Sequence, residues 1–128
     1  MPRIRSVKPE IRKSETVAAW PREVRLAWIY LFGYLDDYGR GLDNLALLKA
    51  ELFPLDHDVT ERKLDHWLAL MCEKPEHDPT EAPPLCRYEV RGRRVLHAVK
   101  WTSHQRVSHP GESAYPPCPV HDEDGEKW

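Results

Sequence analysis

The sequence predicts a small domain that is mainly α-helical and carries one small β-hairpin. Apolar residues recur at helical spacing in three segments, residues 21–35, 45–52 and 60–73. Two runs of strand-forming residues follow, 85–90 and 95–99, on either side of a connection that contains Gly92. Three helices followed by a hairpin are the order of the winged helix-turn-helix class, in which the third helix enters the major groove of DNA.

Each predicted helix has a start signal. Ser14 is expected to cap a short turn of helix that reaches Trp20, and Pro21 suits the first position of the longer helix that follows. Asn44 and Thr60 are expected to cap the second and third helices. In the third helix the apolar residues recur at i, i+3, i+4 and i+7, and they are Leu64, Trp67, Leu68 and Met71. This stripe is the predicted core face.

Residues 36–41 have the composition of a turn, with Gly39 able to take a positive φ, and a short strand is expected at Leu42 and Asp43. Asp36 and Asp37 are adjacent carboxylates, but neighbouring side chains in a turn diverge. No activated nucleophile or Gly-rich phosphate loop accompanies them in the sequence. We therefore expect no enzymatic activity and no cofactor.

The chain divides by composition into an ordered body and two flanking segments. Residues 1–13 form a basic N-terminal arm, and residues 14–107 form the winged-helix domain. Within that domain residues 74–84 are a Pro-rich acidic loop, and residues 85–99 are the wing. Residues 108–128 are a Pro-rich acidic tail that is expected to remain largely unpacked.

Charge of each sign is segregated along the chain, although the net charge is only -2. Residues 1–13 hold five basic side chains and one acidic one, and residues 87–106 hold six basic side chains and one acidic one. Acidic residues gather in the tail instead. Such segregation is typical of proteins that bind a polyanion, because Lys and Arg neutralise phosphate.

The residues expected to contact double-stranded DNA come from the third helix, the wing and the arm. Guanidinium groups are always charged and match pairs of phosphate oxygens. The predicted contacts are Arg62, Lys63, His66, Arg91, Arg93, Arg94, Lys100, Arg3, Arg5 and Lys8. The alternatives are that the wing and helix charges only solvate the surface, and that the arm docks on the domain through Ile4 and Val7.

The cysteines and histidines indicate a disulfide or metal site only weakly. Three cysteines form no paired spacing, which argues against a disulfide framework. Cys118 and His121 have the two-residue gap of zinc sites, with His104 and His109 upstream, but this pattern alone does not predict a metal. Trp101 and His104 are expected to be structural, at the base of the wing.

The chain lacks a signal core and an apolar run that could span a bilayer, so a cytoplasmic location is expected.

Five short motifs carry a resemblance to a known family. They are residues 1–10 (MPRIRSVKPE), 14–15 (SE), 36–40 (DDYGR), 51–56 (ELFPLD) and 101–106 (WTSHQR). With these motifs the chain resembles, from residue 1 to about residue 110, the N-terminal winged-helix domain of phage replisome-organizer proteins. These proteins are related to DnaD-type primosomal replication-initiation proteins and occur in actinobacterial phages.

The resemblance implies a DNA-binding protein that acts in replication initiation of a phage or mobile element inside its bacterial host. It also implies self-association and contact with helicase-loading or other replication proteins. The family usually continues into a second domain for such contacts, and 128 residues leave no length for one. Two other functions stay open: a winged-helix transcription regulator or excision cofactor, and an adaptor that binds proteins rather than DNA.

Overall fold

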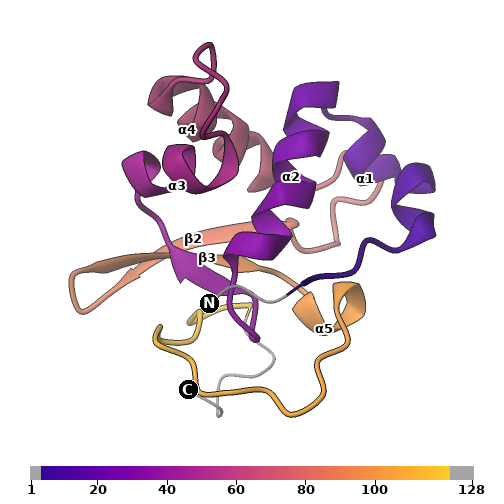
Figure 1. Ribbon diagram of the computed structural model, residues 1–128. Coiled ribbons are helices and arrows are strands. Elements are labelled where there is room, and N and C mark those ends of the chain that lie inside the picture. Colours follow the sequence, from indigo (N-terminus) through magenta and orange to yellow (C-terminus); the bar gives the residue numbers. More distant parts are fainter. Residues whose placement is uncertain (1–3, 122–128) are drawn as a thin grey trace.

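The computed structural model of the chain describes residues 4–121. Over that range five α-helices and one 3-10 helix accompany a three-stranded antiparallel sheet (Figure 1). In chain order the elements are η1 (Pro9–Lys13), α1 (Glu15–Ala18), α2 (Arg22–Tyr34), β1 (Arg40–Leu42), α3 (Leu45–Leu52), α4 (Glu61–Met71), β2 (Leu85–Val90), β3 (Arg93–Ala98) and α5 (Trp101–His104). The fold is thus a small mixed α and β domain. None of the helices described is long and apolar enough to cross a membrane.

The predicted N-caps are confirmed. The side chains of Ser14, Asn44 and Thr60 accept hydrogen bonds from backbone N–H groups in the first turns of α1, α3 and α4. The helix ends differ from expectation by a few residues, since α1 ends before Trp20 and α4 ends at Met71 rather than near residue 73. Pro21 occupies the N-cap position of α2 instead of its first turn.

The core lies where α2, α3 and α4 cover one face of the sheet (Figure 1). All four residues of the predicted apolar stripe in α4 are buried, which confirms the helical register. Trp67 packs edge-on against Phe53 with the ring centroids 5.8 Å apart. The opposite side of α4 is consequently held toward solvent.

In the sheet, β3 lies between β1 and β2. Successive side chains of a strand point to opposite faces, so the register separates two sets of residues. One set, which includes Leu85, Leu96 and Ala98, packs into the core below the helices and defines the helix face. The other set faces away from the helices, and we call it the tail face: Arg40, Cys86, Tyr88, Arg93, Val95 and His97. The short strand predicted at Leu42 and Asp43 exists, but it begins two residues earlier and ends at Leu42.

The turn of the hairpin consists of Arg91 and Gly92, with φ of 54° and 76°. Positive φ at both central residues is typical of the type I′ turn, which matches the twist of a two-residue hairpin. The expected four-residue connection is thus too long, because Arg93 and Arg94 belong to β3 and pair with Val90 and Glu89. Gly39 also has a positive φ, of 74°, and a Cβ there would lie 2.7 Å from Trp101.

The prediction of a largely unpacked tail is wrong for residues 111–121. This segment runs across the tail face, on the side of the sheet opposite the helices (Figure 1). The hydroxyls of Tyr38 and Tyr88 donate to the carbonyl oxygens of Gly111 and Pro116, and Cys118 is buried. A Pro-rich segment can pack in this way because its backbone carbonyls remain available as acceptors. Residues 122–128 lie outside the part of the chain that is described.

The arm is docked on the domain, but not through the residues predicted. Ile4 is fully exposed and Val7 is about half exposed, so neither anchors it. Instead the backbone N–H of Ser6 donates to the side-chain oxygen of Gln105, whose amide nitrogen donates back to the Ser6 carbonyl. Polar pairing to a buried glutamine therefore fixes the arm, which continues into η1.

Candidate nucleic-acid interface

The solvent side of α4 carries Arg62, Lys63 and His66, all of which are exposed. The Thr60 cap fixes where the helix begins, and burial of the stripe around Trp67 fixes how it is rotated. These two constraints place the three predicted contact residues on the outer surface of the first two turns. All three side chains are accessible from solvent.

An ion-pair network joins α4 to the hairpin. The Arg87 guanidinium donates to both carboxylate oxygens of Asp43 at 2.9 and 3.2 Å, and to Asp65 of α4 at 2.8 Å. Burial alone would lower the pKa of Arg87, but the hydrogen bonds to the two carboxylates outweigh it and raise that pKa. The side chain of Asp43 is only 2% exposed, so this pairing is largely shielded from water. The hairpin and α4 are thereby held in one orientation.

Two arginines of the β2–β3 hairpin, Arg94 and Arg91, are exposed, and Arg94 lies next to that network. Arg94 is 62% exposed and its guanidinium lies 3.5 Å from the Asp43 carboxylate. Because Arg94 alternates with Leu96 and Ala98 along β3, it is on the helix face, toward α4. Arg91 is exposed at the turn itself. We define the basic surface as the exposed side chains Arg62, Lys63 and His66 of α4 together with Arg91 and Arg94 of the hairpin.

Arg93 does not join this surface. It points to the tail face, where its guanidinium donates to the Ala114 carbonyl at 3.0 Å and lies 5.2 Å from the ring centroid of Tyr115. The sequence placed it with Arg91 and Arg94 because all three are close in the chain. Because the turn is only two residues long, Arg93 and Arg94 both belong to β3, and their side chains point to opposite faces of the sheet.

Arg5 is a structural residue in this fold rather than an accessible phosphate contact. Its side chain is 7% exposed, pairs with Asp37 at 3.1 Å and donates to the Leu35 carbonyl. The guanidinium also lies 5.3 Å from the centroid of the Trp101 ring. The prediction treated Arg5 like its exposed neighbours, because nothing in the local sequence indicates that part of a terminal arm is buried.

The other predicted contacts of the arm and hairpin lie apart from the basic surface. Lys8 is exposed and donates to the Ser103 carbonyl at 2.6 Å. Lys100 pairs with Glu81 at 3.7 Å and lies beyond the end of β3, which is about 20 Å from the turn at the strand rise. Arg3 lies outside the described residues.

The carboxylates of Asp36 and Asp37 have structural partners. Asp36 accepts from the backbone N–H groups of Tyr38 and Arg40 and from the Ser113 hydroxyl. Asp37 accepts from Arg5 and from the Gly111 backbone, as described for the arm and tail. The two carboxylates hold the turn, the arm and the tail together.

Of the histidines considered at the sequence level, His104 and His109 lie outside any cluster of metal-ligating side chains found among residues 4–121. His104 packs against the rings of Trp28 and Phe32, and the Trp101 indole donates to the Asp37 carbonyl, so the structural roles predicted for both residues are confirmed.

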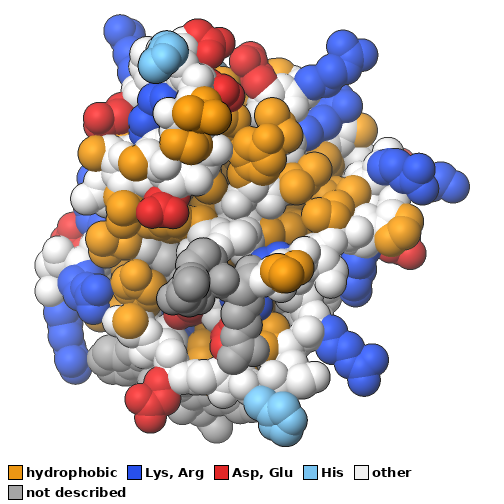
Figure 2. All heavy atoms as spheres, in the orientation of Figure 1, with side chains coloured by type: hydrophobic (Ala, Val, Ile, Leu, Met, Phe, Trp, Pro, Cys, Tyr) orange, Lys and Arg blue, Asp and Glu red, His pale blue; other side chains and the backbone are white. Residues whose placement is uncertain are grey.

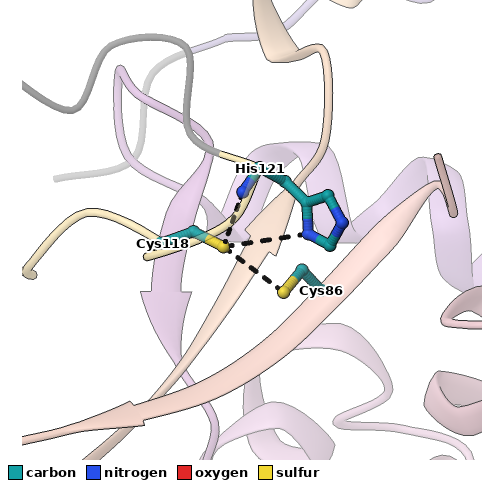
Figure 3. Close-up of side chains that lie close together, drawn as sticks. All are labelled: Cys86, Cys118 and His121. Carbon is teal, nitrogen blue, oxygen red and sulfur yellow. Dashed lines mark hydrogen bonds between the residues drawn. The ribbon is translucent and has the colours of Figure 1, made fainter.

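Cys118 and His121, in contrast, approach Cys86 of β2 (Figure 3). Cys86 was not among the predicted metal ligands, because its approach to Cys118 spans 32 residues and depends on the course of the tail.

Comparison with models of protein families found no match to this chain, and comparisons with curated proteins and with solved structures found none either.

Proposed function

We propose that this chain is a non-enzymatic, double-stranded-DNA-binding protein of the winged-helix type. The observation that carries the proposal is the basic surface on α4 and the hairpin, together with the element order α2, β1, α3, α4, β2, β3. In this assignment α4 is the recognition helix and enters the major groove. The β2–β3 hairpin is the wing, and it follows the phosphate backbone.

The charge distribution on α4 suits this role. Asp65 lies on the solvent side of the helix among the basic residues and would repel a phosphate on its own. Its ion pair with Arg87 offsets that repulsion at the junction of helix and wing. Arg62 and Lys63 lie three and two residues before Asp65, and His66 follows Asp65 directly. Contacts to base edges are therefore assigned to the first two turns of α4, and phosphate contacts to Arg91 and Arg94.

We assign the biological role to replication initiation in a phage or mobile element, on the strength of the five sequence motifs. We assign self-association at an origin to the exposed apolar side chains of Leu26 and Tyr30 on α2 and Leu47 on α3. All three are more than one-third exposed, and hydrophobic side chains gather over these helices in Figure 2. A transcription regulator or excision cofactor would use the same DNA surface. Neighbouring genes separate the two roles, since a helicase or primase gene indicates replication and an integrase gene indicates excision.

The test is a salt titration of binding to duplex DNA from the genome that encodes the chain. Each phosphate contact contributes roughly 0.9 to the slope of log K against log salt. Arg94→Ala and Arg91→Ala should each lower the slope by about that amount. Lys74→Ala is the matched control, because it removes one exposed cation just beyond the other end of α4 and should leave the slope unchanged. Equal slopes for all four proteins, or no binding at low salt, would refute the assignment.

Footprinting locates the site and tests the role of α4. Arg62→Ala should relax sequence preference at one or two positions of the protected site, whereas Arg94→Ala should weaken binding to all sequences equally. If Arg62→Ala also weakens all sequences equally, then α4 contacts only the backbone and is not a recognition helix.

A further inference from the structure

Two metal-ligating side chains of the tail, Cys118 and His121, lie against the tail face of the sheet, close to Cys86. Cys118 and His121 lie on the tail, Cys86 lies on β2, and their side chains point toward one another (Figure 3). The Sγ atoms of Cys86 and Cys118 are 3.4 Å apart, and the Cys118 Sγ is 3.9 Å from Nδ1 of His121. All three ligand atoms lie within 4.8 Å of one another.

These separations are close to those of a tetrahedral zinc site. With Zn–S bonds of about 2.3 Å and Zn–N bonds of about 2.0 Å, two sulfur ligands lie about 3.8 Å apart, and a sulfur and a nitrogen about 3.6 Å apart. A disulfide instead requires the sulfur atoms to approach to about 2.05 Å. The side chains are arranged as ligands around a common centre rather than as a bonded pair.

Backbone donors favour the thiolate form that a metal requires. The His121 N–H donates to the Cys118 sulfur at 3.3 Å, so the Cys-Pro-Val-His segment curls around that atom. A cation at the centre would stabilise both thiolates at once.

His97 is the second, independent sign of a ligand. It is 0% exposed and lies directly opposite Cys86 in the register of β2 and β3, on the tail face. Neither of its ring nitrogens has a hydrogen-bond partner among residues 4–121. A buried polar group without a partner is rare and points to a ligand that satisfies it. A metal ion bound between His97 and the two cysteines would do so.

We propose that Cys86, His97, Cys118 and His121 bind one zinc ion in a four-coordinate site that fastens the tail to the sheet. Two sulfur and two nitrogen ligands are a composition that zinc favours, and with four protein ligands no position stays open for a substrate. The role is thus structural. Two thiolates balance the charge of the ion, so a neutral centre is buried between the sheet and the tail. His97 lies opposite Cys86, but its ring nitrogens are outside the group of three ligand atoms, so its side chain has to turn toward them to become the fourth ligand.

The first experiment measures metal in the full-length chain, purified from zinc-containing medium without chelator. We expect about one zinc per chain by elemental analysis. Replacement by cobalt should give the absorption of a tetrahedral centre together with thiolate-to-metal charge-transfer bands. Removal of the metal with a chelator should lower the melting temperature. A chain that holds no zinc and gives no thiolate band with cobalt, or one isolated with a Cys86–Cys118 disulfide, would overturn the proposal.

Variants assign the ligands. Cys118→Ser should abolish stoichiometric zinc, whereas Cys72→Ser should retain it, since Cys72 is a half-buried thiol at the end of α4 and outside the cluster. His97→Ala should weaken cobalt binding and alter its spectrum, and His109→Ala is its exposed control. An unchanged spectrum for His97→Ala would remove it as fourth ligand. If Cys118→Ser fails to fold, cobalt titration of the wild-type chain still decides the proposal. These outcomes do not depend on DNA binding.

Discussion

The two faces of the sheet are stabilised in different ways. The helix face buries large apolar side chains, among them Leu85, Leu96 and the rings of α2 and α4. The tail face carries Arg40, Cys86 and His97, and it is covered by a segment whose contacts are mostly hydrogen bonds to backbone carbonyls. Apolar burial is nondirectional and large in total, whereas each polar contact adds little and requires its own geometry. We therefore expect packing on the helix face to determine whether the chain folds. Contacts on the tail face are expected to determine how firmly residues 111–121 are attached to the sheet.

The largest effect is expected from the helix face. Trp67→Ala removes a buried ring that packs on Phe53 and should lower the free energy of unfolding by about 3–5 kcal/mol. Chemical denaturation of the variant measures this loss. Leu55→Ala is the control, because Leu55 is 85% exposed and its truncation should change stability by less than about 0.5 kcal/mol. A small loss for Trp67→Ala would contradict the assignment of the core to this face.

A second prediction compares the two carboxylate partners of the Arg87 guanidinium, Asp43 and Asp65. Asp43→Asn removes the buried partner of Arg87 and should cost about 2–3 kcal/mol, because it weakens two charge-assisted hydrogen bonds in a shielded site. Asp65→Asn removes the partner that is 53% exposed and should cost less than about 1 kcal/mol. The comparison is by denaturation at low and high salt. Equal losses would mean that burial does not distinguish the two ion pairs.

The sequence predicts the helix face well because its signals are local. The Thr60 cap and the stripe with Trp67 are set by residues within a few positions of one another, and both are confirmed. The tail face depends on which residues far apart in the chain meet. The approach of Cys118 to Cys86 depends on the path of a Pro-rich segment, and local composition does not specify that path. The contacts of Arg93 and Arg5 with the tail and the Asp37 turn were missed for the same reason.

The tail face should respond to a smaller change. Tyr88→Phe deletes only the hydroxyl that donates to the Pro116 carbonyl and should cost about 0.5–1.5 kcal/mol. If zinc fastens the tail, this cost should be present in the metal-bound chain and should shrink once a chelator has released the tail. Thermal melting with and without chelator measures the difference. A cost that does not depend on metal would separate the tail contact from the zinc site.

The smallest effect on stability is expected from the two arginines that begin β3, one on each face. Arg93→Ala loses the contact with the Tyr115 ring and should cost about 0.5–1 kcal/mol, while DNA binding is unchanged because the side chain is turned toward the tail. Arg94→Ala should change stability even less, since its ion pair with Asp43 is long and the Arg94 side chain is itself 62% exposed, but it should lower the salt slope of DNA binding by roughly 0.9. Adjacent residues with the same charge then separate into a structural and a binding role. Denaturation gives the change in stability of each variant, and salt titration gives the slope of its DNA binding. A lower slope for Arg93→Ala would mean that DNA contacts both faces of the hairpin.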